Sequence, residues 1–261
     1  MKYGICLTAS LPVRISDSHK SEMVSQLLFG EAFSVIEDKK EWIKISCSLD
    51  NYEGWIEKNL TIKISEHTYQ RLNESSLVVL NKKIISLTLE NGTDMLLLPG
   101  STLPFFNPSK RIFTVEEKVF ILNEKPETGI EIATPDSIVK TAHVYINSPY
   151  LWGGRSLFGI DCSGFTQVVF KINHILLPRD ASQQEIEGEP VDNLKDIREG
   201  DLAFFQNNEG KTIHVGILLQ ENKIIHASGR VRSDYFNEEG ILNKETNTLT
   251  HHFKSIRRVL H

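Results

Sequence analysis

The sequence predicts a protein of the α+β class, in which two small β modules precede a domain of helices and antiparallel strands. Two observations favour this fold. Short apolar or alternating stretches, separated by turn residues, fill residues 1–125. From about residue 136 the spacing becomes helical, and strand-like stretches then follow up to the C-terminus. A length of 261 residues also fits two or three compact domains.

The first β module is predicted for residues 1–60, where four stretches have the composition of strands. These stretches are PVRIS, EAFSVIED, EWIKISCS and EGWIEKNL, with Gly30 before the second of them. A second module is predicted for residues 61–125, from SLVVL, IISLTL, DMLLLPG and KVFILN, with a turn at Asn91-Gly92. Both stretches have the size of small all-β modules.

A segment rich in Pro, Gly and acidic residues, 126–135, is predicted to be a linker to the last domain, 136–261. This domain begins with a helix for which Asp136 or Ser137 is the expected N-cap. A second helix is expected over SGFTQVVFKIN. Strands are expected at GDLAFFQ, HVGILLQ, KIIHASG and near IRRVL. Helices followed by an antiparallel sheet indicate an α+β domain.

Composition excludes several classes of function. The net charge is −5, and no Lys/Arg cluster is dense enough to follow nucleic-acid phosphates or to bind an anionic membrane. No window approaches eighteen apolar residues, so no membrane span is expected. The N-terminus lacks the pattern of a secretory signal, although a chain trimmed of its signal would look similar. Cys6, Cys47 and Cys162 are odd in number and far apart, which favours reduced thiols in the cytoplasm.

One cysteine stands where chemistry is expected. Cys162 follows Asp161 and begins the second helix, and the N–H groups and dipole of a helix start favour an anion there. We therefore expect a lowered thiol pKa. A nucleophilic thiol needs a base, and His214 in TIHVGILL is the candidate. His226 in KIIHASG is expected to orient His214 through its second ring nitrogen.

The two histidines allow a test of strand register. They are expected on the two strands of an antiparallel hairpin joined near QEN. Their rings lie on the same face only if the loop has an odd number of residues or the hairpin has a bulge. Because His226 can orient His214 only from the same face, we predict an odd loop or a bulge, with His214 and His226 as direct or diagonal neighbours.

Simpler interpretations exist for each of these residues. A lone cysteine at a helix start is most often a small buried hydrophobe, and a lone histidine in a strand is most often part of the core. Trp152 is interpreted as a core aromatic residue. His251-His252 has no partner set of a known metal motif and is expected to face solvent.

Five motifs in order carry a family resemblance. YLWGGRSLFGIDCSGFTQVVF, LPRDASQQ, REGDLAFF, HVGILL and IIHASG resemble the NlpC/P60 family of papain-like cysteine peptidases, over residues 135–261. Residues 1–60 are similar to bacterial SH3 domains, whereas residues 61–125 match that pattern only loosely. The resemblance implies a papain-like catalytic domain after two SH3-like barrels.

The resemblance also implies an activity, the hydrolysis of the bond between γ-D-glutamate and a diamino acid in murein peptides. By the family pattern Cys162 is the nucleophile, His214 the base and His226 the third polar residue. Tyr150 lies near the oxyanion position by the same pattern. No metal ion and no organic cofactor is implied.

Further residues resemble those that hold the substrate in this family. Asp161 and Ser163 match residues that hold its amino and carboxylate ends, and Ser182 matches the cleft wall. In SH3-bearing relatives the first SH3 domain closes one end of the cleft, with a Glu and an aromatic residue facing the free amine of the substrate. Glu22 and Tyr52 match these two residues. This implies short peptides with a free N-terminal L-alanine, and cell-wall recycling. We expect a monomer that binds murein peptide but neither nucleic acid nor membrane.

Two other functions remain open at the level of sequence. The first alternative to the peptidase is a catalytically degenerate protein that binds wall peptides. The second is a Cys-His amidase or acyltransferase on the same fold. The presence of both Cys162 and His214 favours the enzyme over the degenerate binder. The choice of bond depends on the shape of the pocket.

Overall fold

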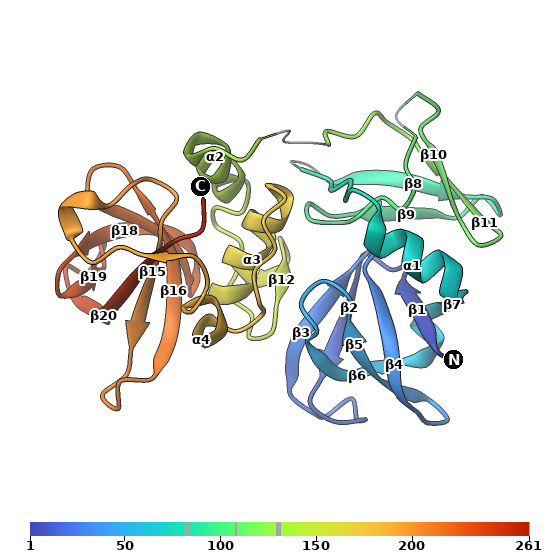
Figure 1. The fold of residues 1–261 in the computed structure, drawn as a ribbon, viewed down its shortest axis with the longest axis horizontal. Coiled ribbons are helices and arrows are strands. Elements are labelled where there is room, and N and C mark those ends of the chain that lie inside the picture. Colours follow the sequence, from blue (N-terminus) through green and yellow to red (C-terminus); the bar gives the residue numbers. More distant parts are fainter. Residues whose placement is uncertain (82–83, 108, 129–131, 261) are drawn as a thin grey trace. The chain divides into compact units, whose positions relative to one another are not determined.

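The chain divides into two units in the computed structural model, which describes residues 1–81, 84–107, 109–128 and 132–260 (Figure 1). Unit 1 comprises Met1–Gly129 together with Trp152–Ser156. Unit 2 comprises Ile130–Leu151 together with Leu157–His261. Of the predicted linker, residues 129–131 lie outside the described residues.

The first sheet of unit 1 has seven strands in the order β3-β2-β6-β5-β4-β1-β7, and neighbouring strands are antiparallel. Three of them, β4, β5 and β6, lie in the stretches that the sequence predicted, and β2 overlaps the predicted stretch PVRIS but begins two residues earlier. The last strand, β7, pairs with β1, so the sheet continues beyond residue 60. The bounds are β1 (Tyr3–Cys6), β2 (Ser10–Arg14), β3 (Met23–Leu28), β4 (Ala32–Asp38), β5 (Trp42–Cys47), β6 (Glu53–Glu57) and β7 (Thr61–Ile64), with a 3-10 turn η1 (Lys58–Leu60).

The second part of unit 1 contains a helix that the sequence analysis did not predict. In α1 (Glu66–Glu74) the Ser65 side chain accepts a hydrogen bond from the Thr68 N–H and so caps the first turn. A four-stranded antiparallel sheet follows in the order β10-β11-β8-β9. Its strands are β8 (Ile85–Leu89), β9 (Asp94–Leu97), β10 (Ile112–Val115) and β11 (Lys118–Leu122).

One hydrophobic core joins both parts of unit 1. Ile5 and Phe29 from the first part pack in the same cluster as Leu72 of α1 and as Phe113 and Phe120 of the second sheet. The Phe29 ring meets Phe113 and Phe120 edge-on, with centroids 6.0 and 5.6 Å apart. The second β module therefore completes a core that the first module shares.

Unit 2 begins with two helices. In α2 (Pro135–Val144) the N-cap is Thr134, in a reciprocal capping box with Ser137, so the prediction of Asp136 or Ser137 as the cap was wrong. Proline is favoured at the first helical position, which explains why the helix begins at Pro135. Helix α3 (Cys162–Ile172) is buried along its whole length. A short helix, α4 (Ala181–Gln184), and a 3-10 turn, η2 (Leu194–Asp196), follow.

A closed antiparallel barrel of six strands, β15 to β20, forms the rest of unit 2, because β20 pairs with both β15 and β19. Helix α3 packs on β16 and β17. The predicted α+β class is confirmed. The strands are β15 (Leu202–Gln206), β16 (Thr212–Leu219), β17 (Lys223–Ser228), β18 (Arg230–Asn237), β19 (Gly240–Leu242) and β20 (Leu249–Arg258). Two shorter strands of unit 2 are β13 (Gly159–Ile160) and β14 (Glu189–Pro190), whereas the short strand β12 (Arg155–Ser156) belongs to unit 1.

No helix in the described part of the chain combines the length and the apolar composition that a membrane span requires.

Candidate active site

Cys162 is the first residue of α3 and is buried. The preceding residue, Asp161, is the N-cap, and its Oδ1 accepts a hydrogen bond from the Gly164 N–H at 2.7 Å. The Cys162 thiol also accepts a hydrogen bond from the backbone N–H of Val215 on β16. Since His214 is the neighbour of Val215 on that strand, the helix start and the barrel meet at the thiol.

The register prediction is confirmed. His226 on β17 pairs with Gly216 on β16, and the strands are joined by a loop of three residues, Gln220 to Asn222. His214 lies two residues from Gly216, on the same face as His226 and diagonal to it. The Nε2 atom of His214 and the Nδ1 atom of His226 are 2.8 Å apart.

Gly216 makes room for this pair. A Cβ atom at Gly216 would lie 2.9 Å from the Cβ of His226 and 2.7 Å from Cδ1 of Ile224. A side chain at this position would push His226 away from His214. The glycine in HVGILL is therefore required by the close approach of the next strand.

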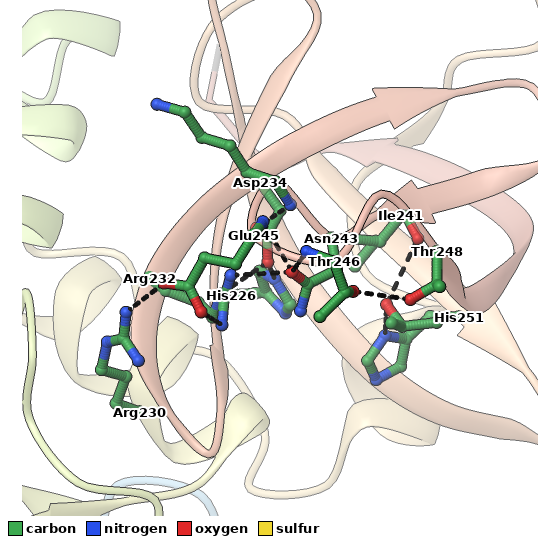
Figure 2. A network of polar contacts seen from close by, with 12 residues as sticks. His226, Arg230, Arg232, Asp234, Ile241, Asn243, Glu245, Thr246, Thr248 and His251 are labelled. Atoms are coloured by element: carbon green, nitrogen blue, oxygen red, sulfur yellow. Dashed lines mark hydrogen bonds and ion pairs between the residues drawn. The ribbon is translucent and has the colours of Figure 1, made fainter.

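Asp234 on β18 completes the arrangement and was missed by the sequence analysis. Its Oδ2 lies 3.1 Å from Nε2 of His226, and both side chains are buried (Figure 2). Asp234 also accepts hydrogen bonds from Arg232 and from the backbone N–H of Lys244. Its pairing register gives it the same face as His226. An acidic residue at an even spacing from His226, beyond a turn at Gly229, was the signal in the sequence.

The hydrogen-bond partners determine which ring nitrogens carry protons. A carboxylate only accepts, so His226 donates from Nε2 to Asp234. Neutral His226 therefore accepts at Nδ1, and the donor is Nε2 of His214. Neutral His214 then has its lone pair at Nδ1. This nitrogen is therefore the position at which His214 can act as a base.

The predicted lowering of the Cys162 pKa is wrong for this structure. Burial, and then the charge of Asp161, raise the pKa of the thiol to about 12, which outweighs the hydrogen bond from Val215. Burial, followed by the neighbouring His226, holds the pKa of His214 well below its usual range. The thiol of Cys162 and the imidazole of His214 are therefore both neutral at neutral pH.

A second buried residue that the sequence analysis missed is Arg179, from the motif LPRDASQQ. Its guanidinium binds both carboxylate oxygens of Asp161, at 3.1 and 2.5 Å, and donates to Ser163 Oγ at 2.9 Å. Bidentate pairs of this kind fix geometry as well as charge. Arg179 therefore holds the two residues that flank the thiol. Ser182, in the first turn of α4, is exposed.

Tyr150 lies near the thiol in unit 2. Burial, and then the charges of Cys162 and Asp161, raise the pKa of its hydroxyl to about 12. Its backbone N–H donates to the Gly229 carbonyl at 3.0 Å, which ties it to the hairpin of β17 and β18. The phenol therefore stays protonated and is a hydrogen-bond donor near the nucleophile.

Glu22 and Tyr52 belong to unit 1. The exposed Glu22 accepts a hydrogen bond from the indole Nε1 of Trp152 at 2.6 Å. Trp152 is 59% exposed, so its interpretation as a core residue was wrong. Half-buried Tyr52 lines a small cavity together with Arg155. Trp152 and Arg155 both lie in the segment Trp152–Ser156, which precedes Cys162 in the sequence but belongs to unit 1.

The expectation that His251 faces solvent was also wrong. Its ring stacks on His214, with centroids 4.1 Å apart and planes at 25°. Burial lowers the pKa of His251 to about 4. One ring nitrogen from each of His214, His226 and His251 lies within 4.8 Å of the other two. His252, in contrast, is exposed.

Comparison with known proteins gives matches over both units. Residues 147–250 match the NlpC/P60 family and residues 13–59 match the bacterial dipeptidyl-peptidase Sh3 domain. The chain is 32% identical to a γ-D-glutamyl-L-lysine dipeptidyl-peptidase of Bacillus subtilis, over 78% of this chain and 71% of that protein. A protein of the same name from Bacillus cereus is 28% identical, over 89% and 74%.

Solved structures show the same fold. A crystal structure of an NlpC/P60 family protein from Bacillus cereus superposes with a TM-score of 0.83 at 19% identity, covering 99% of this chain and 100% of that one. An NlpC/P60 endopeptidase from Photobacterium damselae gives 0.72 at 18% identity, over 97% and 70%. With the sequence of the Bacillus subtilis enzyme matched over most of its length, the chain belongs to the NlpC/P60 family of cysteine peptidases.

Proposed function

We propose that this peptidase hydrolyses the bond between γ-D-glutamate and a diamino acid in short murein peptides whose N-terminal L-alanine is free. The observation that carries the proposal is the similarity to two γ-D-glutamyl-L-lysine dipeptidyl-peptidases, which extends over both units. A dipeptidyl-peptidase must recognise the amino end of its substrate. The match of residues 13–59 to an SH3 domain of such enzymes supports a role of unit 1 in that recognition.

In the proposed mechanism Cys162 attacks the γ-glutamyl carbonyl while its proton moves to Nδ1 of His214. The neutral resting state makes this transfer part of the attack rather than a step before it. His226 holds His214 in the required tautomer. The backbone N–H of Cys162 and the hydroxyl of Tyr150 bind the oxyanion. His214 then protonates the leaving amine, and water hydrolyses the thioester.

The same proposal assigns the substrate-binding residues. Asp161 and Ser163, both oriented by Arg179, contact the backbone ends of the peptide, and Ser182 contributes to the wall of the site. Glu22 binds the free ammonium group, and Tyr52 packs near it. The hydrogen bond from Trp152 supports this role, because it fixes the direction of the Glu22 carboxylate.

We place this reaction in the recycling of murein peptides in the cytoplasm. All three cysteines lie among the described residues and none forms a disulfide, which supports a reducing compartment. A substrate with a free amino end is a fragment released from the wall, which supports recycling. Retention of the protein in a periplasmic or secreted fraction would contradict this location.

The test of the activity uses L-Ala-γ-D-Glu-L-Lys and its meso-diaminopimelate counterpart. We expect release of L-Ala-γ-D-Glu and the free diamino acid, identified by mass spectrometry. Cys162→Ala should lower turnover by several orders of magnitude, because it removes the nucleophile. A chain that binds the peptides but leaves them intact would be a degenerate binder. Release of any other product would indicate an amidase or acyltransferase.

The role of Glu22 predicts a selective loss. An ammonium–carboxylate pair contributes about 1.5–3 kcal/mol, so Glu22→Gln should lower kcat/KM on the free-amine peptide by roughly 10- to 150-fold. Activity on the N-acetylated peptide should be low in the unmodified enzyme and unchanged by the substitution. Glu37→Gln, at another exposed acid of unit 1, is the matched control. Equal turnover of both peptides by the unmodified enzyme would contradict the requirement for a free amine.

A further inference from the structure

Three histidine rings meet at the end of the barrel, and the proposed mechanism uses only two of them. His214 comes from β16, His226 from β17 and His251 from β20. Ring centroids are 4.1 Å apart for His214 and His251, 5.0 Å for His214 and His226, and 5.7 Å for His226 and His251. One ring nitrogen of each lies within 4.8 Å of the other two. Three imidazole nitrogens this close form a ligand set that suits zinc once the His214 ring, which is stacked on His251, tilts toward a common point.

We propose that His214, His226 and His251 form an inhibitory site for Zn²⁺, and that the bound ion switches the peptidase off. The ligand atoms are Nε2 of His214, Nδ1 of His226 and Nε2 of His251. The inhibitory consequence rests on the proposed role of His214 as the base. Binding of the ion itself does not depend on that role.

Groups around the site prepare two of the three ligand atoms. Asp234 accepts from Nε2 of His226, which leaves the lone pair of that ring at Nδ1. A carboxylate behind a metal-binding histidine is the usual partner that fixes its orientation. Figure 2 shows Asp234 and His226 within one network of polar contacts, in which Asp234 also accepts from Arg232 and from the Lys244 N–H.

His251 is prepared in the same way. The Thr250 hydroxyl donates its single proton to the Ile241 carbonyl at 3.2 Å, so Thr250 Oγ1 is an acceptor for the His251 ring. His251 Nδ1 lies 2.9 Å from that oxygen and therefore carries the proton. The lone pair of His251 is at Nε2. Neither Asp234 nor Thr250 has to change partner when a metal ion binds.

His214 is the ring that changes. In the resting state its Nε2 carries the proton donated to His226. A metal ion at Nε2 requires this proton to move to Nδ1, which leaves His214 neutral and releases no proton. With Zn–N distances of about 2.0–2.1 Å, tetrahedral ligand atoms lie about 3.3 Å apart, so the contact of 2.8 Å widens by about 0.5 Å.

This proton shift explains the inhibition. Nδ1 of His214 is the atom that must accept the Cys162 proton, and with a metal ion on Nε2 it is already protonated. The ion lies at the nitrogen of His214 that faces His226, so Cys162 is not a ligand. The proposed site therefore differs from one in which an active-site thiolate binds the metal ion. Binding by a thiolate alone would be possible for any exposed cysteine.

The test measures metal binding and inhibition separately. Co²⁺ is titrated into the full chain carrying Cys162→Ala, and its visible absorption is recorded. We expect one ion per chain with the spectrum of nitrogen ligands, and the same affinity in the chain that retains Cys162. His251→Phe keeps a ring for stacking but removes the ligand, and should weaken binding more than about 100-fold. His252→Phe, at the exposed neighbouring histidine, is the matched control and should leave it unchanged.

For inhibition, Zn²⁺ should abolish peptide cleavage by the unmodified enzyme, and a chelator should restore it. His251→Phe should retain activity without metal and escape inhibition at the same Zn²⁺ concentration. Equal Co²⁺ affinity in the unmodified and His251→Phe chains would overturn the proposal. A sulfur-to-cobalt charge-transfer band, lost together with binding in Cys162→Ala, would overturn it as well. Because Co²⁺ binding needs no substrate, its result is independent of whether the proposed peptide is cleaved.

Discussion

Asp234 determines the protonation of both histidines through a chain of hydrogen bonds. The carboxylate fixes the proton of His226 at Nε2, and His226 in turn fixes the proton of His214 at Nε2. The nitrogen of His214 that is left without a proton is thus selected by a residue two hydrogen bonds away. The pKa of Asp234 is held far below its usual range despite burial, by hydrogen bonds from His226, Lys244 and Arg232. Asp234 therefore remains ionised, and a hydrogen-bond acceptor, at neutral pH.

Asp234→Asn is predicted to reduce activity while leaving substrate binding intact. An asparagine amide can donate to Nε2 of His226 and so favours the opposite tautomer in both rings. We expect kcat to fall by about 10²–10⁴-fold, with little change in KM, as for other catalytic histidines in the wrong tautomer. Asp234→Glu should recover part of the activity. A rise in KM together with the fall in kcat and a loss of stability would indicate a merely structural role.

At the scale of elements, the start of α3 combines a cap with a buried ion pair. Asp161 caps the helix and also neutralises Arg179, which is itself almost fully buried. The helix and its start were predictable from the sequence, because Asp161 precedes an apolar run of helical spacing. Arg179 was not, since eighteen residues separate the two partners.

Asp161→Ala is predicted to destabilise unit 2 by about 3–5 kcal/mol, because it leaves the Arg179 charge buried without its carboxylate. Loss of the cap adds about 1 kcal/mol. The measurement is hydrogen exchange of the α3 amides. Asp136→Ala, at an exposed helix-start acid paired with Lys140, is the control and should cost less than about 1 kcal/mol. Unchanged protection of α3 in Asp161→Ala would show that the ion pair does not stabilise the helix.

At the scale of the whole molecule, the segment Trp152–Ser156 belongs to unit 1 although its neighbours in sequence belong to unit 2. Arg155 is the anchor. Its guanidinium binds both oxygens of Glu31, at 2.8 and 3.0 Å, and both residues are buried. Its backbone N–H donates to the Gln26 side chain at 2.8 Å. The segment that precedes the thiol is therefore tied to the SH3 module by a desolvated pair.

Glu31→Gln is predicted to destabilise unit 1 by about 3–5 kcal/mol, because the buried Arg155 loses its counter-charge. All three tryptophans, Trp42, Trp55 and Trp152, belong to unit 1, so tryptophan fluorescence reports its unfolding selectively. The fluorescence transition should shift to lower urea concentration. Glu37→Gln, in the same unit but exposed, should not shift it. An unchanged midpoint in Glu31→Gln would contradict a stabilising role of the pair.

The histidine cluster predicts how stability depends on pH. Burial lowers the pKa of His214, His226 and His251, the last to about 4. As pH falls below the unfolded value of about 6.5, the unfolded state binds protons before the folded state does. The free energy of unfolding should therefore be maximal above pH 6.5 and fall between pH 6.5 and 4. The slope of the unfolding free energy against pH gives the number of protons that the unfolded state binds in excess of the folded state. With a chelator present, His251→Phe should reduce this number by about one. An equal slope in both chains would exclude His251 from the effect.

The sequence by itself determined the features that depend on local pattern. The α+β class and the helix that begins at Cys162 follow from residue periodicity and spacing. The odd loop between the strands of His214 and His226 was predicted from the requirement that the two rings share one face, and the strand register confirms it. These features are local because a strand alternates every residue and a helix start needs only its cap and its apolar face.

Only the tertiary structure decided which distant residues meet. Asp234 and His251 reach the site because their strands, β18 and β20, belong to the closed barrel, and Arg179 reaches it through its ion pair with Asp161. Burial raises the pKa of Cys162 and so reverses the expectation from the helix start alone. The shared core of unit 1 likewise joins residues far apart in the chain. Desolvation and pairing energies depend on which groups pack together, and no local stretch of sequence specifies that.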